Sequence, residues 1–223
     1  MDLKGKKIVF LGDSITVGVC SSGEGYRYWE LLGKRTGATC LGYGINGTTI
    51  APFWHPVQEW EHHFQHFNTR VDSMDPDADL VVVYGGVNDY IGGDAPLGHI
   101  DDRTEETFYG ALHVLYTHIF ERYPHAQLIV MGPNHCIEEH AGSRRDSRYN
   151  FTLREHSLAD YVQAVRDVTE YYGIPMLDLF KCAEMQPAVP SIREKYLPDG
   201  LHPNDAGHQR LADRLYAFLQ TLE

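Results

Sequence analysis

Short apolar runs alternate along this chain with amphipathic segments, and this alternation constrains the fold more than any other feature. Four runs have the length and composition of buried strands and are bounded by turn residues: 7–11, 80–84, 127–131 and 174–179. Residues 39–43 form a fifth, more glycine-rich candidate between two helical stretches. We therefore predict a five-stranded sheet that is buried on both faces.

The segments between these runs have the periodicity of helices that cover a sheet, for example over 108–119 and 158–172. Asn204 and Asp205 supply an N-cap and a first-turn acid for a last helix, which we expect to pack near the first strand. Its apolar face is predicted to contain Leu211, Leu215, Phe218 and Leu222. Connections of more than a dozen residues predict right-handed βαβ units and a mainly parallel α/β fold, a three-layer α/β/α sandwich with ligands at the carboxyl ends of its strands.

Length and charge narrow the range of functions. A chain of 223 residues suits a single domain, 1–223, and no repeat or Pro/Gly/Ser-rich linker suggests a boundary. The 31 acidic residues exceed the 19 lysines and arginines, which gives a formal net charge of −12. Because such a surface repels phosphate backbones, we expect neither nucleic acid nor an anionic membrane as a partner.

The N-terminal region and the cysteines indicate a compartment. The apolar run at 8–11 is too short for a signal peptide or a membrane span. The 4 cysteines are widely spaced, with no CxxC pair, which fits reduced thiols. We therefore expect a cytoplasmic protein without stable membrane association, unless a leader has been removed.

Two short segments carry residues that suit acyl transfer. Ser14 follows the first strand, at the edge of the sheet where a doubly wound fold opens its crevice. Asp199 and His202 stand three apart just before the last helix, so the carboxylate can hold the imidazole Nδ1–H and leave Nε2 to accept a serine proton. Taken singly, Ser14 is more often a helix cap, and an Asp-Gly-Leu-His turn is more often a surface turn.

Acyl transfer also needs donors for the developing oxyanion, and two further segments contain candidates. Gly44 and Gly47 follow the second strand, and either backbone N–H can approach a ligand closely. Asn88 follows the third strand and can donate from its side chain, although an isolated asparagine more often forms an Asx-turn. Spacing alone leaves the choice between Gly44 and Gly47 open.

Together, the sequences GDSI at 12–15, GINGT at 44–48, GVND at 86–89 and DGLH at 199–202 resemble the four blocks of the SGNH (GDSL) hydrolases, in the family's order. The resemblance implies a flavodoxin-like sandwich with an open site and no dedicated lid, and no metal, nucleotide or other cofactor. It also implies a triad of nucleophile, base and orienting carboxylate and an oxyanion hole of two backbone N–H groups and one side-chain amide. The triad residues are Ser14, His202 and Asp199, and the donors are Ser14, Gly47 and Asn88. An ordinary α/β-hydrolase is disfavoured because the chain has no GxSxG elbow.

Other patterns allow competing hypotheses. The 13 histidines invite a metal site, above all His62 and His66, which are four apart on a predicted helix. HExxH is absent, so a solvated or stacked histidine face is the preferred interpretation. We expect most of the aromatic residues to be core: Phe53, Trp54, Trp60, Phe64, Phe67, Tyr84 and Tyr90. A few beside the cleft would form a platform for a sugar ring.

The sequence thus predicts a serine esterase acting on a small-molecule or carbohydrate ester, with an acetyl group on a carbohydrate as the leading substrate. A lipid esterase, lysophospholipase or thioesterase is the alternative. A glycan-binding module that keeps the fold without catalysis is a different class, and would be expected to lack a triad residue. Short acyl groups are expected because little sequence is left over for a hydrophobic lid. The oligomeric state is not encoded in any recognisable motif.

Overall fold

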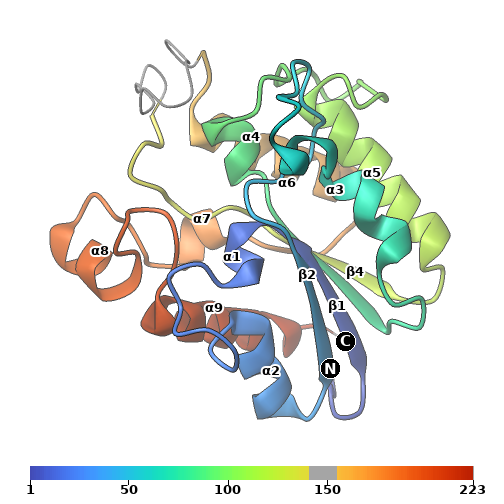
Figure 1. Cartoon of the computed structure of the whole chain (residues 1–223). Coiled ribbons are helices and arrows are strands. Elements are labelled where there is room, and N and C mark those ends of the chain that lie inside the picture. Colours follow the sequence, from blue (N-terminus) through green and yellow to red (C-terminus); the bar gives the residue numbers. More distant parts are fainter. Residues whose placement is uncertain (141–154, 223) are drawn as a thin grey trace.

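The computed structural model describes residues 1–140 and 155–222 and contains a parallel sheet in the strand order β2-β1-β3-β4-β5 (Figure 1). This is the order of flavodoxin-like doubly wound folds. The strands lie close to the predicted positions, and their bounds are Lys7–Gly12 (β1), Thr39–Gly44 (β2), Leu80–Tyr84 (β3), Gln127–Met131 (β4) and Met176–Leu177 (β5). The predicted three-layer α/β/α class is confirmed.

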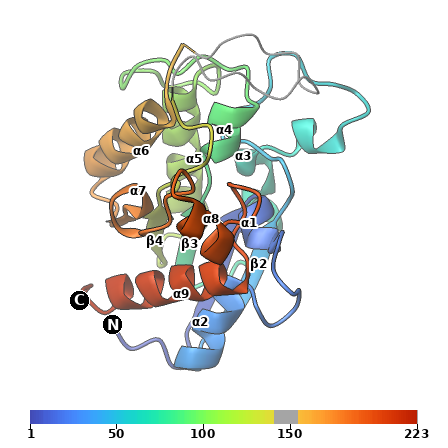
Figure 2. The same ribbon diagram turned by 90° about the vertical axis from the view of Figure 1, so that its left-hand side faces the viewer.

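Helices cover both faces of the sheet. Helices α2 (Tyr28–Thr36) and α9 (Asp205–Leu219) lie on one face, and α3 (Phe67–Arg70), α5 (Phe108–Arg122) and α6 (Leu158–Tyr172) lie on the other (Figures 1 and 2). Two 3₁₀ turns, η1 at Glu61–Phe64 and η2 at Val71–Ser73, flank α3. The α-helices are α1 (Ser14–Val17), α2 (Tyr28–Thr36), α3 (Phe67–Arg70), α4 (Val87–Ile91), α5 (Phe108–Arg122), α6 (Leu158–Tyr172), α7 (Leu179–Cys182), α8 (Pro190–Tyr196) and α9 (Asp205–Leu219).

Alternate side chains of each central strand enter different hydrophobic cores. In β1, Val9 and Leu11 pack with α3, α5 and α6, whereas Ile8 and Phe10 pack with α2 and α9. Every residue of β3 is buried, as expected for a strand covered on both faces. The continuous apolar runs in the sequence therefore reflect two cores divided by one sheet.

The last helix begins and packs as predicted. The Asn204 side chain accepts a hydrogen bond from the Gly207 N–H at 3.1 Å, which satisfies one of the free donors at the start of α9. Leu211 and Leu215 are fully buried in the same core as Ile8. This packing fixes the segment just before α9 relative to the end of β1.

Two predicted segments differ from the structure. The strand predicted at 174–179 is limited to Met176–Leu177, because the Asp178 side chain accepts from the Lys181 N–H and starts helix α7. The second is 136–150, where a run of charged residues in the sequence predicts a long solvated loop, but Cys136 and Glu139 are buried. The Glu139 carboxylate lies 2.6 Å from His135 Nδ1 and so has a partner. Residues 141–150 of that segment lie outside the described residues.

Within residues 1–140 and 155–222, no helix is long and apolar enough to cross a membrane.

Leu215→Ala should lower the free energy of unfolding by about 2–5 kcal/mol, because it removes a fully buried side chain at the interface of α9 and the sheet. Urea unfolding monitored by circular dichroism measures the change. Gln209→Ala, on the exposed face of the same helix, is the control and should change stability by less than about 0.5 kcal/mol. Equal effects of the two substitutions would contradict the assigned packing.

Candidate active site

Ser14 lies where the sequence predicted a nucleophile, two residues beyond the end of β1 and at the start of α1. The helix is capped by Asp13, whose Oδ1 accepts from the Ile15 N–H at 2.9 Å. Ser14 is therefore not needed as the cap, which was the simplest alternative for this residue. Its side chain is 7% exposed and lines a cavity.

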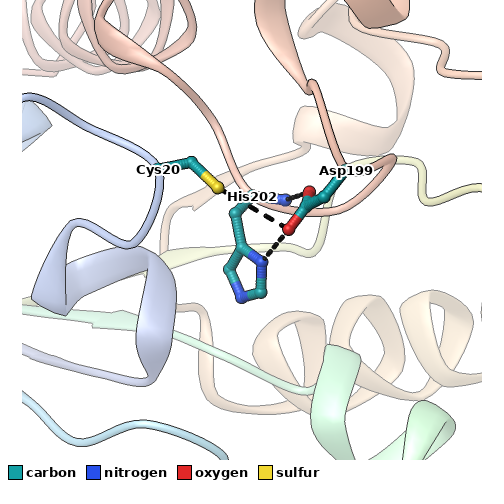
Figure 3. Close-up of side chains that lie close together, drawn as sticks. All are labelled: Cys20, Asp199 and His202. Atoms are coloured by element: carbon teal, nitrogen blue, oxygen red, sulfur yellow. Dashed lines mark hydrogen bonds and ion pairs between the residues drawn. The ribbon is translucent and has the colours of Figure 1, made fainter.

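His202 joins Ser14 to Asp199 by two hydrogen bonds. Ser14 Oγ lies 2.9 Å from His202 Nε2, although the two residues are 188 positions apart in the sequence. His202 Nδ1 lies 2.6 Å from Asp199 Oδ2, and Figure 3 shows this contact. A proton on Nδ1 leaves Nε2 as an acceptor for the serine hydroxyl, which is the arrangement needed for general-base catalysis.

The Asp199 carboxylate also stabilises the turn between Asp199 and His202. Asp199 Oδ1 accepts from the backbone N–H groups of Leu201 at 2.9 Å and His202 at 2.7 Å. Gly200 has φ +83°, a left-handed conformation that glycine adopts without strain. Burial opposes ionisation of Asp199, but these hydrogen bonds and the one from the imidazole outweigh it and hold its pKa well below the usual range.

Asn88 and Gly47 lie on the cavity beside Ser14. The Asn88 Nδ2 group donates to the Thr48 carbonyl at 3.0 Å, and a primary amide carries a second N–H that can serve a ligand. Gly47 has φ +74°. Gly44, the other candidate, is packed instead against α1, because an added Cβ there would lie 2.6 Å from the Val17 nitrogen. Its missing side chain is explained by close packing.

Arg70 organises the backbone around the site, and sequence reasoning missed it. Its buried guanidinium donates to the Gly12 carbonyl at 3.1 Å, the Tyr43 carbonyl at 2.8 Å and Thr48 Oγ1 at 3.0 Å. Burial lowers the pKa of Arg70 to about 10, so the group remains charged near neutral pH. One cation thus ties the end of β1 to the loop that contains Gly47. No local pattern around residue 70 signals this role.

Asp89 holds the same loop from the other side. Its carboxylate accepts from the Ile50 N–H at 2.9 Å and the Ala51 N–H at 2.8 Å. Burial raises the pKa of Asp89 to about 7, and the hydrogen bonds from Ile50 and Ala51 oppose that rise. Asn88 and Asp89 are adjacent in the GVND block, so one residue lines the cavity while the next fixes the loop at Ile50 and Ala51.

The cavity at the triad has a volume of about 730 Å³, within the range of small-molecule sites. One wall comes from residues 53–63, which contribute Phe53 and Trp60 to the lining. The ring of Phe53 stacks on that of His63 at 3.7 Å between centroids, and Trp60 stacks on His62 at 5.8 Å. The backbone of this wall is anchored where Asp94 accepts from the Trp54 N–H at 2.7 Å.

This wall corrects two expectations. Of the seven aromatic residues expected to be mostly core, Phe67, Tyr84 and Tyr90 are buried, whereas Trp54 and Phe64 are exposed and Phe53 and Trp60 line the cavity. The helix predicted to carry His62 and His66 is wrong. His62 lies in the 3₁₀ turn η1 and faces the cavity, while His66 precedes α3 and lies 3.2 Å from Glu105.

Comparison with known proteins identifies the family. Residues 10–210 match the model of the GDSL-like lipase/acylhydrolase family. The chain is 25% identical over 228 residues to a GDSL lipase of Mycobacterium tuberculosis, covering 96% of this chain and 82% of that protein. It therefore belongs to the GDSL-like lipase/acylhydrolase family and is an esterase-type hydrolase.

Solved structures show the same fold. A crystal structure of a protein from Lactobacillus plantarum is 30% identical, with a TM-score of 0.80 and coverage of 99% of both chains. The lipase/acylhydrolase from Enterococcus faecalis is 21% identical, with a TM-score of 0.62, covering 97% of this chain and 96% of that one. The fold similarity thus extends well beyond the segments that contain the motifs.

Asp199→Asn should lower the free energy of unfolding at neutral pH, and its difference from wild type should shrink as the pH falls below about 4. A carboxyl group with a depressed folded-state pKa stabilises the fold above its unfolded pKa and loses that contribution on acidification. Urea unfolding at several pH values between about 7 and about 3 measures the difference. A difference that grows on acidification would contradict the depressed pKa.

Proposed function

We propose that this hydrolase is a serine esterase in which Ser14, His202 and Asp199 form the catalytic triad. The observation that carries the proposal is the continuous contact from Ser14 Oγ to His202 Nε2 at 2.9 Å and from His202 Nδ1 to Asp199 Oδ2 at 2.6 Å. Both Ser14 and His202 line the cavity, so a bound ester carbonyl can reach the nucleophile.

The reaction proceeds through an acyl-enzyme. His202 Nε2 accepts the Ser14 proton as Oγ attacks the carbonyl carbon, and Asp199 stabilises the resulting imidazolium. Collapse of the tetrahedral intermediate expels the alcohol, which takes the proton from His202. Water then attacks the acyl group with His202 again as base, and the carboxylic acid leaves while Ser14 recovers its proton.

The oxyanion is stabilised by the N–H groups of Ser14 and Gly47 and by the side-chain amide of Asn88. Arg70 and Asp89 support these donors, because they hold the loop of Gly47 and Thr48 from opposite sides. Since the Asn88 amide is already fixed by the Thr48 carbonyl, little reorganisation is needed when charge develops.

The preferred substrate is a small acyl ester, with acetyl esters of carbohydrates as the leading class. Among the described residues, the cavity lining contains no lysine or arginine, so the site offers no cation for a phosphate-bearing alcohol. Burial lowers the pKa of His62 and of His63, which favours neutral rings. Trp60 provides an aromatic face and Asn46 a hydrogen-bonding side chain, a combination suited to an uncharged polyol.

A lipid esterase is the second candidate, and the apolar part of the same cavity favours it. Val19, Val57 and Ile91 all line the space near Ser14 and would contact an acyl chain. The Mycobacterium tuberculosis relative is named a GDSL lipase. Thioesters of large anionic carriers fit less well because the described part of the cavity lining has no lysine or arginine.

Ser14→Ala should abolish ester hydrolysis, with turnover falling by several orders of magnitude, because it removes the attacking oxygen. A fluorophosphonate probe should label Ser14 in the wild type, as located by mass spectrometry, and His202→Ala should also inactivate. Ser21→Ala, in the loop after α1, is the matched control and should retain both activity and labelling. Absence of an adduct on Ser14 in folded protein would favour a non-catalytic glycan-binding module.

Asn88→Ala should lower kcat by about 10²–10³ with little change in KM, since an oxyanion donor acts mainly in the transition state. Steady-state kinetics with a nitrophenyl ester measure both constants. Asn46→Ala removes another amide from the same cavity and should cost far less in kcat. A neutral effect at residue 88 would refute its place in the oxyanion hole.

Long acyl groups should have no advantage, so kcat/KM should not rise from acetyl to octanoyl nitrophenyl esters. A true acyl channel would bury about 0.8 kcal/mol per methylene and raise kcat/KM about fourfold for each one. Acetate release from an acetylated oligosaccharide is the second measurement. A steep rise with chain length and no acetate release would favour the lipid esterase.

The cavity wall formed by residues 53–63 provides a test variant and a control variant for the acetate-release assay. Trp60→Ala should impair hydrolysis of the acetylated oligosaccharide, because it removes an aromatic face on which a sugar ring can stack. Trp54→Ala is the control, since that side chain is 51% exposed and is not among the residues that line the cavity.

A further inference from the structure

Cys20 lies beside Asp199, the residue that contacts His202 (Figure 3). Its Sγ is 3.7 Å from Asp199 Oδ2, the same oxygen that contacts His202 Nδ1 at 2.6 Å. One ligand atom from each of the three residues can be chosen so that all lie within 4.8 Å of one another. Cys20 has no part in the proposed esterase reaction and does not line the substrate cavity.

We propose that Cys20 Sγ, Asp199 Oδ2 and His202 Nδ1 form an inhibitory binding site for Zn²⁺. Thiolate, carboxylate and imidazole are the three ligand types that this ion takes in proteins. Two anionic ligands and one neutral ligand balance its charge, and a water molecule completes a tetrahedron.

The distances suit this ion with a small adjustment. Zn²⁺ bonds of about 2.0–2.3 Å in a tetrahedron separate neighbouring ligand atoms by about 3.4 Å. The separation of 3.7 Å between Cys20 Sγ and Asp199 Oδ2 is already close to that value. The contact of 2.6 Å between Asp199 and His202 must lengthen by about 1 Å, so the ion replaces their hydrogen bond.

The backbone that carries the thiol is held in place before any ion binds. Cys20 has φ +67°, a conformation that a non-glycine residue keeps only when its surroundings impose it. Directly after Cys20, Ser21 Oγ donates back to the Gly18 carbonyl at 2.7 Å. The N–H and Oγ of the next residue, Ser22, each donate to the Asp205 carboxylate at 2.7 Å. These bonds connect the loop to the start of α9, three residues after His202.

Coordination inactivates the base by changing its tautomer. In the active form the imidazole proton is on Nδ1, and Nε2 accepts from Ser14. An ion on Nδ1 moves that proton, through solvent, to Nε2, which then becomes a donor and cannot take the serine proton. The Cys20 thiol releases its proton to solvent, so one proton is released per ion bound. The site is open to the ion, because Cys20 is exposed and the Asp199 side chain is 42% exposed.

The test compares Cys20 variants in activity and in direct binding. Zn²⁺ should inhibit ester hydrolysis by the wild type, and a chelator should restore it. Cys20→Ser and Cys20→Gly should keep basal activity and need more than about tenfold more Zn²⁺ for half inhibition, since loss of even an outer-shell partner weakens metal sites by about that factor. The glycine variant suits the positive φ and guards against misfolding of the serine variant. Cys182→Ser, which removes a half-buried thiol elsewhere, should behave as wild type.

The inhibition assay rests on the proposed esterase function, because it measures ester hydrolysis. A spectroscopic titration of metal binding does not need that activity and therefore tests the site independently. Cd²⁺ should produce a thiolate charge-transfer band in the wild type, in Cys182→Ser and in Ser14→Ala, but not in either Cys20 variant. Failure of the esterase proposal would leave that band intact. Equal Zn²⁺ sensitivity of the wild type and the Cys20 variants, or absence of the band, would overturn the site.

Discussion

The pairing of β1 with a parallel strand on each side is the interaction on which the site depends. In this register Gly12, the last residue of β1, lies opposite Gly44 of β2 and Tyr84 of β3. Parallel strands end at the same edge of a sheet, so the three loops that follow them begin side by side. Ser14, Gly47 and Asn88 are each within four residues of such an end. Backbone pairing within the sheet therefore brings Ser14, Gly47 and Asn88 to one cavity.

The other half of the site depends on the docking of α9. Helix α9 packs against α2 and the sheet through Leu211 and Leu215, and its cap at Asn204 fixes the direction of the chain just after His202. The Asp199 carboxylate then accepts from the backbone N–H of His202, and this fixes the turn so that the imidazole contacts Ser14. Hydrophobic burial supplies the placement, and charge-assisted hydrogen bonds supply the orientation.

Two faces of one imidazole connect the proposals. Nε2 faces Ser14 and the substrate cavity, whereas Nδ1 faces Asp199 and, beyond it, Cys20. A ligand on Nδ1 can thus change the protonation of Nε2 without entering the cavity, because the two ring nitrogens share one proton in the neutral state. The wall that contains Trp60 and His62 borders the substrate cavity, which Cys20 does not line.

The sheet, its covering helices and the four blocks that contain the candidate residues could all be predicted from the amino-acid sequence alone. Those features are local: apolar runs, helical periodicity and turn residues are set by neighbours along the chain. The end of the last strand was misjudged because Asp178 starts a helix instead, and a capping side chain outweighs the apolar character of Leu179. The aromatic residues of the cavity wall were misassigned because hydrophobicity alone does not distinguish a core from a pocket lining.

The packing of distant segments determines which of these residues meet. The bond from Ser14 to His202 spans 188 positions, and the bonds of Arg70 to Gly12, Tyr43 and Thr48 join three separate segments. Gly44 and Gly47 were equivalent by spacing, yet one is packed against α1 and the other lies on the cavity. Cys20 carried no motif at all, and its place beside Asp199 follows from a loop tied to Asp205. Such contacts depend on how distant segments pack in space, which no local pattern specifies.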